Sequence, residues 1–303
     1  MPLFSVIIPH YNSVSLLKQL LESIPVDEAI QVIVVDDKST ECLAGIENQV
    51  TSRGGIFLHN TTDKKGAGTC RNIGLAQATG KWLVFADADD YFLDGAFDVM
   101  RRHVNSGADI VHFIPTSVDM ETGEISTRHT WCEKLVQRYL ADPVEENELM
   151  LRYRFMVPWS KMVRCKMVKD AGIFFDEVIA ANDIMFSAKC GYCAKTVEAF
   201  ADKIYCVTKS RGTLTTRHDE NAYRARAIVH RNKYKFLKEH IDLKKYGYVV
   251  PMGIRILEHA ARQGYSMKFV YEIYRYFRRE HVAMINIATL RYTFRHMMRR
   301  KAV

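Results

Sequence analysis

The chain has 303 residues, of which 48% are hydrophobic and 26% charged, and its formal net charge is +8. This composition is that of a globular protein, and no apolar run approaches the roughly 20 residues that span a bilayer, so we expect no transmembrane helix. The start of the chain lacks the basic and small-residue features of a signal peptide. The seven cysteines are scattered, which predicts reduced thiols and a cytoplasmic location.

The first 116 residues alternate short β-branched runs with helical patterns. Strands are predicted by the runs at residues 4–9, 31–36, 56–60, 82–86 and 109–116, and helices by the apolar spacing at residues 14–24 and 69–78. Such alternation is typical of βαβ units, so it predicts an α/β fold with a mostly parallel central sheet and flanking helices. Ligands bind at the carboxyl ends of the strands in such sheets.

The rest of the chain has a different pattern. A turn is predicted at residues 119–124, and further elements are helices near 145–156, 165–171 and 183–195 and a strand at 203–209. From Asp219 onward the pattern is helical almost throughout, with an apolar stripe from Phe269 to Phe277. The segment from Arg224 to Val303 holds 19 Lys and Arg against 5 Asp and Glu. We therefore expect a basic helical region at residues 219–303 that meets a polyanionic surface.

The most informative motif is Asp87-Ala88-Asp89-Asp90, which directly follows the strand predicted at residues 82–86. Three carboxylates in four residues repel one another, and a hard divalent cation such as Mg²⁺ or Mn²⁺ relieves that repulsion. A cation held by only one or two carboxylates usually bridges to the phosphates of a substrate. The motif therefore predicts a site for a metal and a diphosphate. A solvated acidic turn is the alternative.

Two further motifs lie at the same predicted edge of the sheet. Asp36 and Asp37 end a strand, where they can accept hydrogen bonds from a nucleobase or a ribose while Ser39 and Thr40 cap the next helix. The alternative is that the aspartates merely cap that helix. The segment from Lys64 to Gly74 has glycines and cations before a helix and resembles a phosphate cradle. Within it, Arg71 can contact a nucleotide, or it can pair with one of the aspartates.

Three candidates lie in the second half of the chain. Asp183, after Asn182, is predicted at a helix start, where a carboxylate is favoured electrostatically and can also serve as a general base. Trp159 can stack on a sugar, although a lone tryptophan is more often part of a core. Arg211 can supply a cation to a diphosphate, or it can be an ordinary surface charge.

Together and in this order, the motifs resemble the family 2 glycosyltransferases, which have the GT-A fold and use nucleotide-sugars. The resemblance covers roughly residues 3–215 and rests on the segments 5–12, 34–37, 71–75, 78–80, 85–90, 158–161, 175–177 and 182–183. It implies a GT-A domain at residues 1–218, with a nucleotide-binding half at 1–116 and an acceptor half at 117–218. The QxxRW motif of processive polysaccharide synthases is absent, so addition of a single sugar is expected.

The resemblance also implies roles for individual residues. Asp89 would bind Mn²⁺ or Mg²⁺, Asp183 would be the general base, and Asn182, which stands where glutamate is common, would lie beside it. Lys38 and Cys70 also depart from the family pattern, which usually has glycine or asparagine at the first position and alanine at the second. The residues implied to bind the nucleotide-sugar are Pro9, Tyr11, Asp36, Asp37, Arg71, Asp87 and Arg211.

We therefore expect an inverting, metal-dependent glycosyltransferase that uses a UDP-sugar to extend a glycan or a lipid-linked acceptor in bacterial surface-polysaccharide synthesis. One alternative is a sugar nucleotidyltransferase, which would require a glycine-rich loop where this chain has His10, Tyr11 and Asn12. The other is a non-catalytic nucleotide-binding scaffold protein.

The basic C-terminal region has two interpretations. Its charge and apolar stripe can dock peripherally on the anionic inner face of the cell membrane, where a lipid-linked acceptor would be found. Alternatively, the stripe packs on the body of the protein or on a second subunit in a homodimer. Nucleic acid is not an expected partner, because no recognised binding module accompanies the charge.

Overall fold

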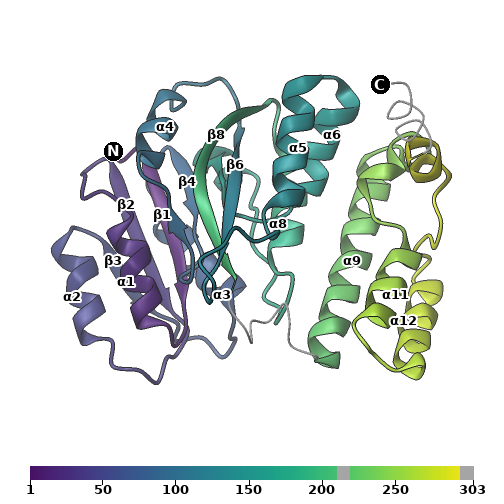
Figure 1. The fold of residues 1–303 in the computed structure, drawn as a ribbon, viewed down its shortest axis with the longest axis horizontal. Helices are drawn as coiled ribbons and strands as arrows, with labels where there is room; N and C mark the ends of the chain where they lie inside the picture. Colours follow the sequence, from purple (N-terminus) through teal and green to yellow (C-terminus); the bar gives the residue numbers. More distant parts are fainter. Residues whose placement is uncertain (210–218, 294–303) are drawn as a thin grey trace. The chain divides into compact units, whose positions relative to one another are not determined.

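The computed structural model describes residues 1–209 and 219–293 and divides the chain into two compact units. The first unit comprises residues 1–178 and 186–211, and the second comprises residues 179–185 and 212–303. Figure 1 shows the strands gathered in the first unit and helices making up the described chain beyond residue 219. Each unit has a hydrophobic core of its own.

In the described residues, eight strands form one sheet with the order β3-β2-β1-β4-β7-β6-β8-β5. The strands β1 to β4 pair in parallel, whereas β7 runs antiparallel to both β4 and β6. Because β6 and β8 also pair in parallel, the sheet is mostly parallel, as the sequence predicts, with β7 and β5 as its antiparallel strands. The strands are β1 (Phe4–His10), β2 (Ile30–Asp36), β3 (Ile56–His59), β4 (Trp82–Phe85), β5 (Tyr91–Phe92), β6 (Ile110–Asp119), β7 (Lys161–Arg164) and β8 (Val197–Lys209).

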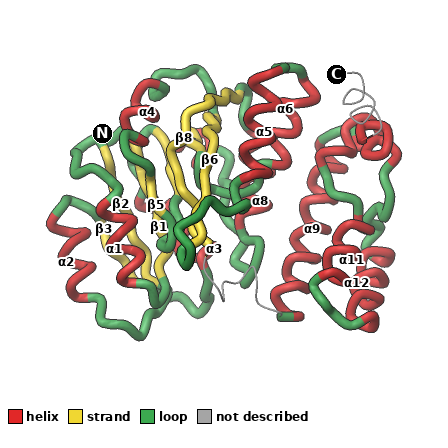
Figure 2. The backbone as a smooth tube through the Cα atoms, in the orientation of Figure 1, coloured by secondary structure: helices red, strands yellow, loops and turns green. Residues whose placement is uncertain are grey.

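Helices flank this sheet, as Figure 2 shows in red against yellow strands. On one face, residues of α3, α7 and α8 pack with Ile7, Ile33 and Phe85 in a single core cluster. On the other face, Phe97 of α4 lies edge-on to Phe4, with ring centroids 6.0 Å apart. The helices of this part of the chain are α1 (Val14–Glu22), α2 (Ala44–Ser52), α3 (Ala67–Gln77), α4 (Ala96–Arg102), α5 (Thr130–Ala141), α6 (Glu145–Arg154), α7 (Cys165–Asp170) and α8 (Asp183–Cys193).

The second unit is built around the long helix α9 (Glu220–His240). The carboxylate of Asp219 caps this helix by accepting hydrogen bonds from the next backbone N–H groups, which satisfies two free donors of the first turn. The labelled elements that follow are α10 (Leu243–Tyr246), η1 (Gly247–Val249), which is a short 3₁₀ segment, α11 (Gly253–Arg262) and α12 (Met267–Arg279), and residues 287–293 are helical as well. No helix in residues 1–209 or 219–293 is both long enough and apolar enough to cross a membrane.

The apolar stripe of α12 is buried in this unit. Phe269, Ile273 and Phe277 share a core cluster with Tyr223 of α9 and Leu257 of α11. The stripe is therefore packed inside this unit, against α9 and α11, and it is not a surface that could dock on a membrane. Neither interpretation of the sequence had the stripe packing within its own unit. A core of this kind explains why the unit can keep so many charged residues in solvent.

Gly80 lies where the backbone before β4 passes closest to β1. Its N–H donates to the Ser5 hydroxyl at 2.8 Å, and a Cβ on Gly80 would lie 2.6 Å from the backbone nitrogen of Ser5. Since backbone cannot move aside cheaply, Gly80→Ala should lower the free energy of unfolding by about 2 kcal/mol or more, measured by chemical denaturation.

A matched control is Gly45→Ala in α2, where the added methyl group meets no heavy atom within 4 Å. This control should be neutral or stabilising by up to about 1 kcal/mol, because alanine favours a helix over glycine. Equal stabilities for the two variants would show that the close approach at Gly80 is not a constraint on the fold.

Candidate active site

The candidate site is formed at the carboxyl ends of β1, β2 and β4. These strands are parallel neighbours, with His10 paired in register to Asp36 and Ile7 paired to Phe85. The segments that carry Tyr11, Asp37 and Asp87 therefore leave the sheet at one edge. This is the edge at which ligands bind in open α/β sheets.

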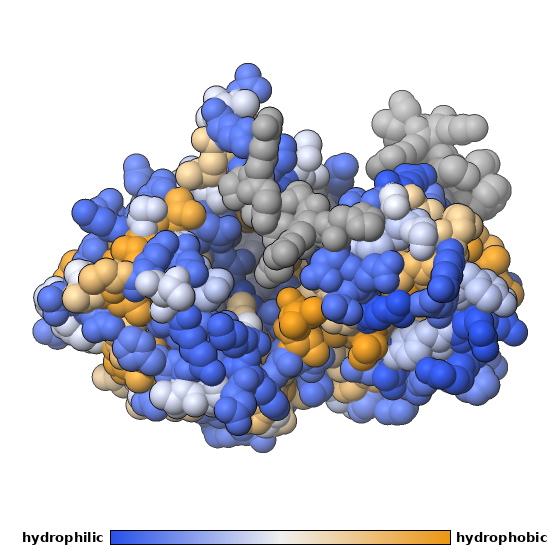
Figure 3. All heavy atoms as spheres, turned by 90° about the horizontal axis from the view of Figure 1, so that it is seen from below, coloured by the Kyte–Doolittle hydropathy of each residue, from blue (hydrophilic) through white to orange (hydrophobic). Residues whose placement is uncertain are grey.

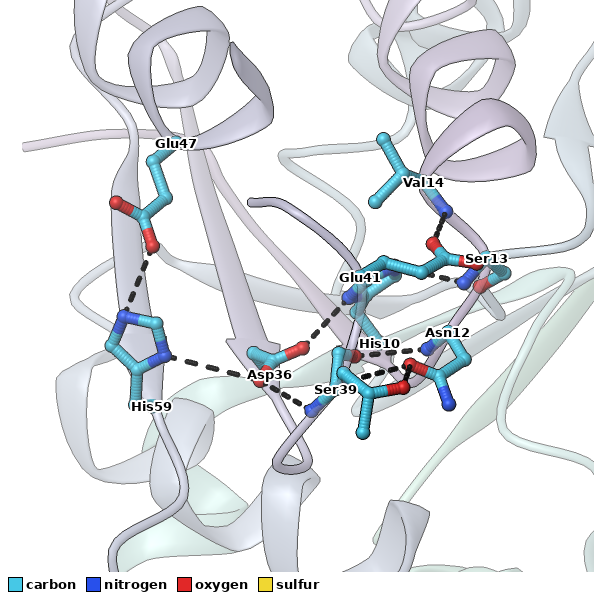
Figure 4. Close-up of polar contacts among 10 residues, drawn as sticks. His10, Asn12, Ser13, Val14, Asp36, Ser39, Glu41, Glu47 and His59 are labelled. Carbon is cyan, nitrogen blue, oxygen red and sulfur yellow. Dashed lines mark hydrogen bonds and ion pairs between the residues drawn. The ribbon is translucent and has the colours of Figure 1, made fainter. Parts of the chain in front are cut away.

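Asp36 is buried and holds the loops that follow β1 and β2 (Figure 4). Its carboxylate accepts from His10 Nδ1 at 2.9 Å and from the Ser39 N–H at 3.0 Å. His10 Nε2 accepts from the Ser13 N–H at 3.3 Å, so the imidazole proton lies on Nδ1. Burial alone would raise the pKa of Asp36, but the hydrogen bonds from Ser39 and His10 outweigh it and lower that pKa. This geometry favours a positioning role for Asp36.

Asn12 joins the same two loops at the next point along the chain. Its N–H donates to Ser39 Oγ at 2.9 Å, and its side-chain oxygen accepts from the Thr40 N–H at 2.8 Å. The prediction that Ser39 and Thr40 cap the next helix is wrong, because α2 begins only at Ala44 and these residues bind the β1–α1 loop instead. Asn12 and Lys38 both have positive φ, 44° and 63°, which costs energy away from glycine. The loops are thus held in a strained, preorganised form.

Two further candidates, Pro9 and Tyr11, lie at the end of β1 but differ in their exposure to solvent. Pro9 is buried within β1, where it contributes no side-chain polar group. Tyr11 follows the end of the strand with 52% of its surface exposed, and the Lys65 ammonium lies 5.5 Å from the centre of its ring. An exposed aromatic face beside a cation can stack on a nucleobase.

Asp37 ties the edge of β2 to the start of α3. It accepts from the Gly66 N–H at 2.7 Å and from Asn60 Nδ2 at 2.8 Å. The pKa of the buried Cys70 thiol is raised, first by burial and then by the charge of Asp37 and a hydrogen bond to it. Gly66 has a φ of 118°, which only glycine adopts readily, so this loop requires a glycine there.

Asp90 anchors the acidic motif and does not face a ligand. Its carboxylate is buried and accepts from the Tyr205 hydroxyl at 3.0 Å and from the Thr208 N–H at 2.7 Å. Thr208 Oγ1 also donates to the carbonyl of Asp89 at 2.6 Å, and the Asp87 N–H donates to the Tyr205 oxygen at 2.9 Å. Two residues of β8 therefore fix the shape of the motif. Tyr205 and Thr208 carried no distinct signal in the sequence beyond their place in a predicted strand.

The other two carboxylates of the motif have different partners. Asp87 forms an ion pair with Arg71, whose guanidinium lies 5.3 Å from the ring centre of Phe175. The alternative that Arg71 pairs with an aspartate is thus what the structure contains. Burial raises the pKa of Asp89, and the negative charge of Asp87 raises it further. In residues 1–209 and 219–293, no side chain donates a hydrogen bond to the Asp89 carboxylate.

This donor set fits a divalent cation of the hard, oxygen-preferring type. A half-buried carboxylate destabilised by its neighbour gains from a positive charge, and Asp89 and Asp87 offer oxygen ligands. Within the described residues no group of three or more His, Cys, Asp or Glu could hold a metal ion by itself. A cation at this position would therefore complete its shell with water and with oxygens of a diphosphate, as Mg²⁺ commonly does.

Asp183 is the first residue of α8, after Asn182 and after Ala181, whose φ of 61° is unusual for alanine. The next turns of α8 are firmly anchored. Phe186 stacks on Phe175 with ring centroids 3.9 Å apart, and the buried Lys161 ammonium donates to Ser187 Oγ at 3.1 Å. The part of α8 from Phe186 onward is therefore firmly anchored in the first unit, and the roles of Asp183 and Asn182 stay predictions.

The remaining two candidates have different outcomes. Trp159 is buried and stacks on Tyr205 with ring centroids 5.7 Å apart, so the structure favours its reading as core over contact with a sugar. Arg211 lies outside the described residues. The sequence did not predict that Lys161 is buried, because nothing in a sequence distinguishes a buried lysine from an exposed one.

Residues 5–172 match the family of proteins described as glycosyl transferase family 2, and the match covers more than half of the chain. The chain therefore belongs to glycosyl transferase family 2, as the resemblance of its motifs predicted. The segments on which the resemblance rests lie within the matched residues, except for 175–177 and 182–183.

Two curated relatives show what the chain is similar to. Poly(ribitol-phosphate) beta-N-acetylglucosaminyltransferase TarS of Staphylococcus aureus is 27% identical over 228 residues, which are 73% of this chain and 37% of TarS. GalNAc(5)-diNAcBac-PP-undecaprenol beta-1,3-glucosyltransferase of Campylobacter jejuni is 33% identical over 112 residues, 35% of this chain and 36% of that protein. The chain thus matches little more than a third of the length of either relative.

Solved structures show the same fold. The crystal structure of S. aureus TarS 1–349 in complex with UDP-GlcNAc has a TM-score of 0.60 at 22% identity and covers 92% of each chain. The mannosyltransferase PcManGT from Pyrobaculum calidifontis, in complex with GDP-Man and Mn²⁺, has a TM-score of 0.53 at 15% identity, covering 90% of this chain and 79% of that one. These similarities confirm the predicted GT-A fold.

Proposed function

We propose that this chain is an inverting glycosyltransferase that transfers one sugar from a UDP-sugar to a hydroxyl group with the help of Mn²⁺ or Mg²⁺. The observation that carries the proposal is the acidic motif after β4. In this motif the Asp90 carboxylate accepts hydrogen bonds from Tyr205 and Thr208, which leaves Asp87 and Asp89 as the carboxylates that can bind a ligand. Family membership and the similarity to TarS, whose structure contains UDP-GlcNAc, support a nucleotide-sugar as that ligand.

The nucleotide would be bound by the loops after β1, β2 and β4. The exposed ring of Tyr11 can stack on the base, and Asp37, with four lone-pair sites and few donors, can accept from it. Arg71 and Asp87 would lie beside the ribose and the diphosphate. The strained loops are already joined by the hydrogen bonds of Asp36 and Asn12, so little order has to be gained on binding.

In the reaction, the acceptor oxygen forms a bond to the anomeric carbon as the bond from that carbon to the diphosphate oxygen breaks. The electron pair of the broken bond leaves with the nucleoside diphosphate, and the acceptor proton passes to the Asp183 carboxylate. A bound divalent cation supplies the charge that stabilises the departing diphosphate. One displacement inverts the anomeric configuration, since no second carboxylate nucleophile takes part.

The acceptor would be a glycan or a lipid-linked saccharide of a bacterial surface polymer. The names of the two relatives specify a poly(ribitol-phosphate) acceptor and a polyprenyl diphosphate-linked acceptor, and these names support an acceptor of that kind. A protein acting there would work on the cytoplasmic side of the membrane, on which nucleotide-sugars are made.

The test is a donor screen in the presence of Mn²⁺. We expect UDP-sugars to raise the melting temperature more than GDP- or dTDP-sugars do, and at least one UDP-sugar to be hydrolysed or transferred with release of UDP. Hydrolysis without an acceptor is slow, so UDP release is followed over hours with a coupled assay. A chain that binds a UDP-sugar but releases no UDP with any donor would be a nucleotide-binding protein and not an enzyme.

A further inference from the structure

The helix α12 has a second, exposed face beside the buried stripe. Met267, Tyr271, Tyr274 and Arg278 follow one another at the spacing of a single helical face, and they point away from the core residues of the unit. Met267 is 74% exposed, Tyr271 59% and Tyr274 36%, and the two tyrosine rings stack with centroids 6.0 Å apart. An exposed row of two aromatic rings and a methionine needs an explanation, because it gains nothing from water. We call this row the outer face of α12.

Cations surround the outer face. Lys268, Arg275, Arg278 and Arg279 are all exposed. In the described part of the chain, neither Arg275 nor Arg278 forms an ion pair with a carboxylate, whereas Arg224 nearby is held by Glu272 at 2.7 Å. The two arginines line a groove of about 590 Å³ between α9 and α12, together with Ile228, which is 40% exposed. Figure 3, coloured by residue hydropathy, shows hydrophilic and hydrophobic residues side by side over the surface that it draws.

The combination of exposed aromatic rings and cations indicates what binds to the outer face of α12. A soluble polyanion would need only the cations, and a second copy of this unit would be repelled, since residues 219–293 hold 15 Lys and Arg against 7 Asp and Glu. Tyrosine rings at the level of arginine side chains suit the interface of a bilayer, where the rings enter the headgroup layer and the guanidinium groups meet lipid phosphates. An anionic lipid surface satisfies both features at once.

We propose that the outer face of α12 docks this protein on an anionic lipid bilayer, with Tyr271 and Tyr274 in the headgroup layer and Arg275 and Arg278 on lipid phosphates. The docking surface differs from the apolar stripe that the sequence suggested, which is buried. The docking is independent of glycosyl transfer, because every residue that carries it lies on α9 or α12. It would bring a lipid-linked acceptor and the enzyme to the same surface.

The test is co-flotation of the full chain with vesicles of phosphatidylcholine alone or with one third phosphatidylglycerol, at low salt. We expect binding to the anionic vesicles only. The double variant R275E/R278E should reduce the bound fraction by about tenfold or more, because each basic residue at an anionic surface contributes on the order of a fivefold change in partitioning. Y271A/Y274A should also weaken binding, while leaving the net charge unchanged.

The matched control is K244E/K245E, which makes the same charge change in the same unit on exposed residues of α10, outside the groove. This control should keep most of the binding. An equal loss of vesicle binding in R275E/R278E and K244E/K245E would indicate nonspecific charge attraction and would overturn the assigned surface. Failure of the wild-type protein to bind either type of vesicle would overturn it as well. Concentration-dependent dimerisation that is abolished by Y271A/Y274A would assign the face to a second copy instead. UDP-induced thermal stabilisation, measured on every variant, verifies folding and separates this result from the donor screen.

Discussion

Asp183→Asn should abolish glycosyl transfer while nucleotide binding survives. The substitution keeps the size and the helix-start position of the side chain but removes its basicity, so the acceptor hydroxyl loses its proton acceptor. General-base catalysis typically contributes about 10²–10⁴-fold, and we expect kcat to fall by that factor. The dissociation constant for UDP with Mn²⁺, measured by calorimetry, should change by less than about threefold, a small free-energy difference.

The control for this variant is Asp170→Asn, an identical exchange at an exposed aspartate of α7 whose ion pair, within residues 1–209 and 219–293, is with Lys166 on its own helix. It should leave both kcat and UDP affinity unchanged. A parallel loss of UDP binding and of transfer in Asp183→Asn would place Asp183 in the donor site and remove the base assignment. Retention of full activity would mean that another group accepts the proton.

The parallel half of the fold could be predicted because its signals are local. The strand β1 is a run of β-branched residues, and the apolar positions of α1 repeat at helical spacing, so each element is visible without its neighbours. The antiparallel strand β7 has four residues and follows two helices, and nothing in Lys161–Arg164 distinguishes it from a loop. It is ordered by its pairing with β4 and β6, which are distant in sequence. That is why the mostly parallel sheet could be predicted but the antiparallel strand inside it could not.

The candidate site shows the same division. The sequence predicts that carboxylates gather at the strand ends. It does not predict which of two neighbouring carboxylates has a structural role and which can bind a ligand. Asp36 and Asp37 are indistinguishable in the sequence, yet it is Asp36 that accepts a hydrogen bond from His10. Likewise, Asp90 is distinguished from Asp89 only by Tyr205 and Thr208, more than a hundred residues later. Side-chain partners from distant segments assign such roles, and no local pattern encodes them.

Lys38 illustrates the opposite case, in which the structure explains an anomaly of the sequence. The residue stands where the family usually has glycine or asparagine, and its φ of 63° is the left-handed conformation that those residues adopt with least strain. The Lys38 ammonium donates to the Thr62 carbonyl at 2.5 Å, an interaction that glycine could not make. The lysine therefore has a less favourable backbone conformation than glycine would have, but it forms a hydrogen bond between the loops after β2 and β3.

Asp89→Asn should lose metal-dependent transfer without losing stability. The carboxylate of Asp89 has a raised pKa because burial and the charge of Asp87 disfavour its ionised form. A carboxyl group whose pKa is higher in the folded than in the unfolded protein destabilises the fold once the pH rises above both values, so removal of its charge should not lower, and can raise, the melting temperature at pH 7 without metal. Transfer should fall by at least about 10²-fold, since a ligand of the cation that neutralises the leaving group is gone.

The measurements for this prediction are thermal melts and transfer rates with EDTA, Mg²⁺ or Mn²⁺, each with and without UDP. Wild-type transfer should cease in EDTA and return with either metal, and Mn²⁺ with UDP should stabilise the wild type but not Asp89→Asn. Asp94→Asn is the matched control, because Asp94 is an exposed carboxylate four residues after the motif and should behave as the wild type. Undiminished transfer in EDTA would refute a role for any cation at Asp89. Loss of activity with a collapse of the metal-free melting temperature would instead make Asp89 a structural residue like Asp90, because a carboxylate kept for a cation is tolerated by the fold and does not support it.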